Sequence, residues 1–399
     1  MDKLLLIIIV ILGIIAVAQL ARVYELAAAI RNKREEDISL ADNKLNANLW
    51  MLFMILFYAF VIWLCWEYKD KMLPESASEH GIKIDNLLNF NWVVVFAVFF
   101  LVNTLLFGFA WKYYYREGTK AYYYPHNSKW EMVWTIVPTI VLAVMIIYGL
   151  NTWNGITAPA SAEAINIEIY GKQFNWVARY SGDDEKLGYS NYTMISESNA
   201  LGLVTQEKID QKLKELDIEM LGIAKKIAKD VIPDDKRIEM EEKIARLKRT
   251  RVKILNLQAK SKENNYASAN DDKIVKGEFH IPIGKEVNFL IRSQDVIHSA
   301  FMPHFRAQMN AVPGMTTQFK FTPIITTDSM RSKLDDEKFN YILLCNKVCG
   351  SAHYNMQMNI VVDTEKDYNK WLASQKIFKQ DEIPAVTTDS TKIAEIRIK

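Results

Sequence analysis

Four long apolar stretches lie within the first 150 residues and constrain the fold more than any other feature of the sequence. They cover residues 4–20, 49–66, 92–111 and 132–150. Each is close to the roughly 17 to 25 apolar residues that cross a bilayer as a helix, and several end in Trp or Tyr, as is typical of membrane interfaces. We therefore predict four membrane helices. The first stretch also fits a signal segment, but no clear small-x-small cleavage pattern follows it, so we expect it to be retained.

The basic residues predict how these helices are oriented. Two groups of Lys and Arg follow the first and the third stretch: Arg22, Arg31, Lys33 and Arg34, and Lys112, Arg116, Lys120 and Lys129. Since cytoplasmic loops are enriched in Lys and Arg, both loops are predicted to be cytoplasmic. Everything after residue 150 is then expected on the periplasmic side of the membrane.

Beyond residue 160 the periodicity changes to that of strands. Short runs with strand-like composition lie at residues 165–180, 277–281, 286–291, 317–322, 341–345 and 356–362. Such strands and turns predict a Greek-key barrel or sandwich. With 50% hydrophobic residues, three cysteines and a formal charge of +2 in 399 residues, the chain indicates neither nucleic-acid binding nor a disulfide scaffold.

A Lys- and Glu-rich segment, residues 205–262, interrupts the strands. Apolar residues recur in its first half in steps of four and three: Ile209, Leu213, Leu216, Met220, Ile223 and Ile227. This spacing is typical of a helical seam. Pro233 breaks the pattern, and a second set resumes a helical period: Met240, Ile244, Leu247 and Ile254. We predict an antiparallel helical hairpin inserted into the β domain.

One short segment concentrates metal-binding side chains: Cys345-Asn-Lys-Val-Cys349-Gly-Ser-Ala-His353-Tyr-Asn-Met356. Thiolate, imidazole and thioether ligands favour copper over magnesium or calcium. Upstream, the segment Asp295-Val-Ile-His298-Ser299 follows a strand-like run and would bring a second imidazole from a separate strand end. Two cysteines four residues apart in an exported domain could instead form a disulfide, with His353 and Met356 incidental. The spacing and the upstream histidine favour the metal site.

The C-x-x-x-C-G-x-x-H-x-x-M loop, following D-V-x-H-S, resembles subunit II of haem–copper cytochrome c oxidases, which carries the binuclear copper centre called CuA. The resemblance covers about residues 92–200 and 270–375. It implies a set of ligands for two copper ions: bridging Cys345 and Cys349, His298 and His353 on one ion each, Met356 as a weak axial ligand, and the backbone carbonyl of Lys347. Asp295 and Ser299 would support His298.

This resemblance also implies an architecture and a function. We expect a multi-domain membrane protein with N-terminal transmembrane helices and a periplasmic all-β cupredoxin-like Greek-key barrel. The expected divisions are residues 1–70 for extra membrane helices, 88–155 for a transmembrane hairpin, 160–375 for the copper domain with its inserted hairpin 205–262, and 376–399 for a tail. The chain would belong to an aa3-type oxidase in a bacterial inner membrane. It would pass electrons from a c-type cytochrome or haem c domain to haem a of subunit I, where oxygen is reduced to water and protons are pumped.

Two further residues match the family pattern, and a third departs from it. Glu131, at the start of the fourth apolar stretch, corresponds to a glutamate near the entrance of a proton channel; a solvated carboxylate favoured by the helix dipole is the simpler alternative. Phe174 stands where the family commonly has a tryptophan proposed as the electron entry point, and Trp176 follows in the same aromatic segment. Barrel core is an equal alternative for Trp176, so the entry residue stays open between the two.

Several departures weaken other family features. Lys347 replaces a glutamate that helps hold a magnesium or manganese ion at the boundary with subunit I, so that ion is absent or Lys347 replaces its charge. Gln308, Asn310 and Met315 replace a typical Lys, Asp and Arg, which weakens the case for an electrostatically steered donor. The partners implied are subunit I with haem a, haem a3 and CuB, subunit III, and membrane lipid.

Alternatives remain open for the hairpin and for the whole chain. The hairpin is either a self-paired ornament with a solvated face or a docking arm in a respiratory supercomplex. A membrane-anchored copper-binding or copper-delivery protein is the alternative function, and it would need neither Glu131 nor two copper ions. A quinol-oxidising relative is disfavoured because such subunits lack the copper ligands. No C-x-x-C-H motif occurs, so electrons must come from a separate protein.

Overall fold

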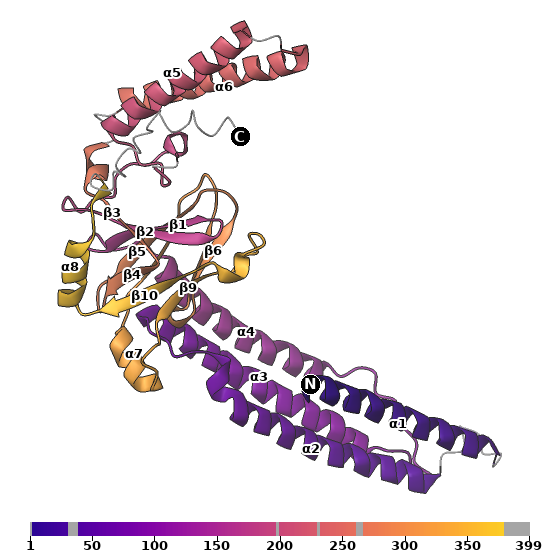
Figure 1. The fold of residues 1–399 in the computed structure, drawn as a ribbon. Coiled ribbons are helices and arrows are strands. Elements are labelled where there is room, and N and C mark those ends of the chain that lie inside the picture. The colour runs from indigo at the N-terminus through magenta and orange to yellow at the C-terminus, as the bar shows by residue number, and fades with distance from the viewer. Residues whose placement is uncertain (1, 31–38, 197–198, 230–231, 261–265, 379–399) are drawn as a thin grey trace. The chain divides into compact units, whose positions relative to one another are not determined.

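A computed structural model describes residues 2–30, 39–196, 199–229, 232–260 and 266–378 (Figure 1). The chain divides into two compact units. One comprises Met1–Leu73 and Phe90–Leu142, and the other comprises Pro74–Asn89 and Ala143–Lys399. The predicted tail lies outside the described residues from position 379 onward.

The prediction of four membrane helices is confirmed. The helices are α1 (Asp2–Ile30), α2 (Leu40–Met72), α3 (Glu79–Lys112) and α4 (Ser128–Thr157), and each contains a window apolar and long enough to cross a membrane. They extend beyond the apolar stretches because their polar ends carry good helix formers and caps. At α2, for example, the Ser39 hydroxyl accepts a hydrogen bond from the Asp42 amide at 3.1 Å.

Two five-stranded sheets form the β domain. The first has the order β3-β2-β1-β5-β8 and contains β1 (Ile165–Lys172), β2 (Asn175–Tyr180), β3 (Lys273–Lys276), β5 (Val287–Ser293) and β8 (Thr317–Phe321). The second has the order β4-β10-β9-β6-β7 and contains β4 (Glu278–Pro282), β6 (His298–Met302), β7 (Ala307–Ala311), β9 (Tyr341–Cys345) and β10 (Gln357–Asp363). This arrangement confirms the predicted all-β barrel or sandwich.

The core of this domain follows from strand alternation. Along β5, Val287, Phe289 and Ile291 are buried while the residues between them are partly exposed. Phe279 and Tyr341, from the other sheet, join the same core cluster. Side chains on one strand alternate between the two faces of its sheet, so every second residue of β5 lines the face that packs in the core.

The insertion between β2 and β3 contains α5 (Gln206–Lys229) and α6 (Asp234–Ala259), which confirms the predicted hairpin (Figure 1). Ion pairs join Asp217 to Arg251 and Glu219 to Lys243, an order that makes the two helices antiparallel. The contact between the two helices is part of a small separate hydrophobic core. Its buried members are Met194, Val204, Ile209, Leu216, Ile254 and Tyr266.

A buried ionic cluster joins the insertion to the β domain. Arg179 on β2 lies between Glu168 on β1 and Asp272 just before β3, and Arg292 on β5 also contacts Glu168. Arg179 donates a hydrogen bond to the carbonyl of Gly188 at 2.9 Å. Asp272 accepts a hydrogen bond from the Gly188 amide at 3.0 Å. Two cations and two carboxylates therefore balance within the fold.

Two short helices complete the domain. The first is α8 (Glu365–Ser374), which contains Tyr368 and Trp371, and its cap residue Thr364 accepts a hydrogen bond from the Asp367 amide at 3.3 Å. The second, α7 (Thr327–Leu334), has eight residues. It was not predicted, because so short a polar helix gives little periodicity to read.

Candidate metal centre

Strand pairing brings the two predicted metal-binding segments together. His298 begins β6 and Cys345 ends β9, and these strands pair antiparallel with Ala300 opposite Cys345. Just beyond the paired strands, the Asn346 amide donates to the carbonyl of Ser299 at 3.0 Å. The imidazole of one loop therefore faces the thiols of the other, although the two lie 47 residues apart in the chain.

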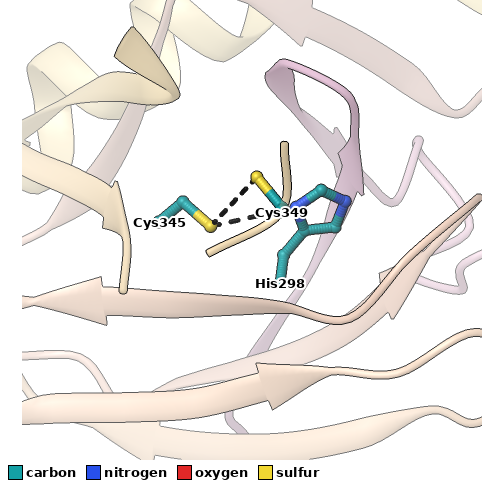
Figure 2. Close-up of side chains that lie close together, drawn as sticks. All are labelled: His298, Cys345 and Cys349. Atoms are coloured by element: carbon teal, nitrogen blue, oxygen red, sulfur yellow. Dashed lines mark hydrogen bonds between the residues drawn. The ribbon is translucent and has the colours of Figure 1, made fainter. Parts of the chain in front are cut away.

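The donor atoms converge (Figure 2). The sulfurs of Cys345 and Cys349 are 3.9 Å apart, and Nδ1 of His298 is 3.8 Å from Sγ of Cys345. Sγ of Cys349 lies 3.5 Å from Nδ1 of His353 and 3.8 Å from Sδ of Met356. The carbonyl oxygen of Lys347 is 3.2 Å from Sγ of Cys345. All six predicted ligands are thus gathered in one place.

Both cysteines are free thiols, which contradicts the disulfide alternative. A disulfide would require a sulfur–sulfur distance of about 2.05 Å. The observed separation instead leaves room for a metal ion at about 2.3 Å from each sulfur, the usual distance for thiolate ligands. Two thiols, two imidazoles and a thioether form the soft donor set that suits copper, so the residues present fit the ion that the sequence predicts.

Burial controls the protonation of this centre. His298 is fully buried, and Cys345, Cys349 and Met356 are at most 9% exposed. Burial and the neighbouring Cys345 thiol raise the pKa of Cys349 to about 11. Without a metal the thiol is therefore protonated at neutral pH, and binding of a metal cation releases the proton.

Asp295 orients the buried imidazole. Its Oδ1 lies 2.9 Å from Nε2 of His298, which leaves Nδ1 directed at the cysteine sulfur. Asp295 also accepts hydrogen bonds from the amides of Gln173 and Val296, each at 2.7 Å. Burial raises the pKa of Asp295, but the hydrogen bonds from Gln173, His298 and Val296 outweigh it and hold the pKa below the ordinary value. An ionised carboxylate behind a histidine fixes its tautomer and its ring orientation.

Sequence reasoning missed two supporting positions, Gly171 near the end of β1 and Gln173 between β1 and β2. The Gln173 side chain donates to the carbonyl of Cys349, while its amide bonds to Asp295, so it ties both metal loops together. A Cβ atom at Gly171 would lie 2.8 Å from the Trp176 ring and 3.1 Å from the His298 ring. A glycine inside a strand often marks such a close approach, and this signal was present in the sequence.

The two aromatic candidates have different surroundings. Trp176 is 2% exposed, and its ring centroid lies 5.8 Å from that of His298. Phe174 is half-buried and so close to the copper loop that a Cβ at Gly350 would lie 2.8 Å from its ring. Trp176 therefore lies within the core beside one predicted ligand, and Phe174 covers the loop nearer the surface.

Glu131 belongs to the other unit and has a local contact of its own. Its Oε1 accepts a hydrogen bond from the Asn127 amide at 3.2 Å, while the Asn127 side chain accepts from the amides of Lys129 and Trp130. This reciprocal arrangement caps the N-terminus of α4. The carboxylate is exposed, so the cap leaves it open to solvent or to a partner.

Four other side chains lie outside the donor cluster. Lys347 and Gln308 have exposed side chains, and Met315 is 58% exposed. His304 packs edge-on against Phe339 and Tyr341, which accounts for its burial without a metal. Among the described residues, His298, Cys345 and Cys349 form the one group of His, Cys, Asp and Glu side chains close enough to hold a metal ion.

Together these features define a class: a membrane-anchored protein with a cupredoxin-like β domain and a soft-donor metal centre. The family model described as "Cytochrome C oxidase subunit II, transmembrane domain" matches residues 65–152, and that of the "periplasmic domain" matches residues 261–365. The alternative cytochrome c oxidase subunit 2 of Bradyrhizobium diazoefficiens is 30% identical over 297 residues, covering 74% of this chain and 81% of the relative. The chain belongs to the cytochrome c oxidase subunit II family.

One further relative agrees with this assignment, and one solved structure aligns with part of the chain. Cytochrome c oxidase subunit 2 of Thermostichus vulcanus is 24% identical over 319 residues, covering 75% of this chain and 77% of the relative. The crystal structure of the periplasmic domain of subunit II of cytochrome oxidase from Bradyrhizobium japonicum aligns at 16% identity with a TM-score of 0.27, covering 54% of this chain and 95% of that one. The family rests on the sequence matches.

Membership establishes the general role. The chain is a transmembrane subunit of an oxidoreductase complex, and its C-terminal domain is periplasmic. Copper and electron transport follow from the family. Residues 1–64 and most of the insertion lie outside both matched family models.

Proposed function

We propose that this chain is the electron-entry subunit of an aa3-type cytochrome c oxidase in a bacterial inner membrane. In this proposal two thiols, two imidazoles, one thioether and one backbone carbonyl would hold two copper ions: those of Cys345, Cys349, His298, His353, Met356 and Lys347. One observation carries the proposal: donor atoms from two distant loops converge around two free thiols. When bound, such a copper pair accepts one electron and shares it between both ions.

The protein's own contribution is to hold these donors still. Asp295 fixes the ring of His298, Gln173 ties the turn to both loops, and burial excludes water from the thiols. Electron transfer is faster when ligands move little between redox states. We infer that this rigid support is what the β domain supplies, and that the outgoing electron passes to haem a of subunit I, where oxygen is reduced to water and protons are pumped.

The electron donor is inferred to dock by apolar contact. Ile297, Val348 and Tyr354 are each next in sequence to a proposed ligand, and they are 44%, 84% and 86% exposed. Apolar side chains exposed together as one patch are typical of interaction sites, and these three belong to the two loops that hold the donor atoms. A c-type cytochrome or haem c domain with an apolar haem edge fits this surface. Phe174, which packs on Gly350, then stands between the donor and the metal loop.

Salt dependence tests this docking mode. We expect the rate of electron input from a cytochrome donor to fall less than about threefold when ionic strength rises from 50 to 300 mM, because exposed charges are what salt screens. Val348→Lys should lower the rate, whereas Met315→Gln should leave it nearly unchanged. A steep salt dependence in the unaltered protein would contradict the apolar docking mode.

Copper stoichiometry tests the centre itself. The full-length chain, produced without subunit I and purified in detergent, would be loaded with copper, oxidised and examined by electron paramagnetic resonance. Two copper ions per chain and a seven-line hyperfine pattern are expected. One copper ion with a four-line pattern would favour the copper-delivery alternative instead.

We propose that Glu131 collects protons on the cytoplasmic side for a channel into subunit I. Its support is the match to the family motif, together with an exposed carboxylate at a membrane boundary. Glu131→Gln is the informative variant, since the amide oxygen can keep the hydrogen bond from Asn127 while the charge is lost. Proton uptake should slow with α4 intact, and unchanged pumping and turnover would overturn this role.

We infer that the parts of the chain divide as the sequence suggested. Residues 1–70 supply additional membrane helices, 88–155 dock on subunit I, 160–375 carry copper, and 376–399 form a tail. Subunit III and a respiratory supercomplex complete the proposed assembly. A magnesium or manganese ion held by the residue at position 347 does not fit, because the exposed ammonium of Lys347 cannot ligate a cation.

A further inference from the structure

The outer face of α6 carries exposed apolar residues at a heptad spacing. Ile238 and Val252 are 58% and 56% exposed, and Ala245, midway between them, is also exposed. The seam toward α5 uses other positions of the same helix, among them Ile254, which is fully buried. Residues seven apart lie almost in line along a helix, so these three form one row on a face that α5 leaves uncovered.

Charged residues flank this row on both sides. Glu241 and Lys248 lie on one side, and Glu242 and Arg249 lie on the other, as their spacing from the row requires. All four are exposed, and the described part of the chain offers none of them an ion pair or a side-chain hydrogen bond. By contrast, Lys243 and Arg251 on the inner edges of the helix are already paired with α5.

These positions are self-complementary about Ala245. If a second α6 is placed antiparallel on this face with a twofold axis at Ala245, Ile238 lies opposite Val252 of the second copy. Residues on the same side of the row then face one another, so Glu242 meets Arg249 and Glu241 meets Lys248. The two members of each charged pair are offset along the helix axis by one residue, about 1.5 Å, and side chains easily span this offset.

We propose that α6 is a homotypic interface through which two copies of this subunit pair antiparallel about Ala245. The symmetry doubles every contact, giving two Ile238–Val252 contacts and four ion pairs around a small central residue. Ala245 allows the two helix backbones to approach closely. Isologous interfaces of this kind require that one surface complement itself, which the arrangement on α6 does.

A second copy fits this face better than a partner with one sign of charge. Each half of the face carries acids at one end and bases at the other, so a uniformly acidic or basic surface would meet like charges on half of it. Individual exposed ion pairs are weak. Anchoring in one membrane raises the effective concentration of the chains, so a modest interface can still be occupied. The pairing would join two oxidase complexes.

Site-specific cross-linking tests the symmetry axis. Ala245→Cys would be introduced into the full-length chain within its oxidase, and membranes would be treated with a short bismaleimide. A homodimer band is expected, because position 245 alone faces its own copy. Ala228→Cys, at an alanine on α5 that is also exposed, is the matched control and should give at least about fivefold less dimer; the unaltered chain controls for its native cysteines.

A charge swap tests the register. In the Ala245→Cys background, Glu242→Arg should lower the cross-linked dimer about tenfold, since attraction becomes repulsion at two symmetric positions. Adding Arg249→Glu should restore it, because the swapped charges again face one another. The proposal is overturned if Ala245→Cys gives no more dimer than Ala228→Cys, if it captures a different polypeptide in place of a second copy, or if the swap fails to restore the dimer.

Discussion

The β domain contains two buried polar clusters that differ in how their groups are satisfied. In the ionic cluster, Glu168 and Asp272 are matched by Arg179 and Arg292, and backbone groups of the insertion take further bonds. In the metal centre, Cys345 and Cys349 face other donors and no protein cation. Buried polar groups are normally paired. The first cluster therefore balances its charges within the chain, although Oδ1 of Asp272 has no hydrogen-bond partner among the described residues, whereas the second gains a cation only when a metal ion binds.

The largest expected effect is a loss of copper binding, which only the metal centre should show. Cys349→Ser removes one of the two proposed copper thiolates, and we expect copper affinity to fall by more than about 100-fold, beyond the loss seen when only a supporting residue of a metal site is changed. The charge-transfer absorption of the centre should disappear, and donor-driven oxygen consumption with it. Cys65→Ser, at an exposed position in α2, is the control and should change neither.

Substitutions in the ionic cluster should lower the stability of the fold and leave copper binding unchanged. Arg179→Met leaves Asp272 buried without its cation, and we expect the free energy of unfolding to fall by about 3–5 kcal/mol. Denaturant unfolding followed by tryptophan fluorescence measures this change. Arg251→Met, which breaks the exposed pair with Asp217, should cost less than about 1 kcal/mol; equal losses from both variants would contradict the comparison.

The pH dependence of stability sharpens the same contrast. Burial raises the pKa of Asp272 to about 6, although Arg179 opposes this shift. Because the pKa is higher in the folded state than in the unfolded chain, this group adds stability at low pH that is lost as pH rises from about 4 to about 6. Between about pH 4 and pH 6, Asp272→Asn should remove a pH-dependent contribution of up to about 3 kcal/mol to the free energy of unfolding.

The pKa of Glu168 shifts in the direction opposite to that of Asp272, so the pH dependence of stability distinguishes the two carboxylates. Burial raises its pKa, but the guanidinium groups of Arg179 and Arg292 outweigh this and lower the pKa below the ordinary value. Its contribution is therefore present above about pH 4.5 and is lost in more acidic solution. Unfolding curves at pH 5 and pH 7 should differ in the unaltered protein and converge in Asp272→Asn; identical differences in both would contradict the assignment.

A smaller effect is expected at Met356, the proposed weak axial ligand. Met356 is 1% exposed, and Met356→Leu keeps its volume while removing the thioether. Copper should still bind, with a reduction potential shifted on the order of tens of millivolts, since weak axial ligands tune copper centres. Redox titration measures the shift. Complete loss of copper would instead make Met356 an essential ligand.

The smallest effect concerns Lys347. Its carbonyl, not its exposed side chain, faces Cys345. Lys347→Ala should therefore leave copper content unchanged and stability within about 0.5 kcal/mol, as at other surface positions. Copper analysis and a thermal melt suffice, and a clear loss of copper would show that the ammonium group supports the centre.

Local sequence was sufficient for some parts of this protein. The four apolar stretches determine the membrane helices because a bilayer sets the length of a spanning helix. Steps of three and four determine the α5–α6 hairpin, because side chains at those spacings share one helix face. Cys345, Cys349, His353 and Met356 lie within one loop, so their common chemistry was visible from the chain alone.

Tertiary structure decided the rest because strand pairing joins residues that are distant in sequence. It directs His298 at Cys345 across 47 positions and brings Gln173 to Cys349 across 176. Arg179 finds Asp272 only after the whole insertion, 93 positions later. Burial, which raises the pKa of Cys349 and of Asp272 alike, exists only in the fold. The sequence alone therefore determined which ligands are present, and the packed sheets determined which of them meet and how their charges are satisfied.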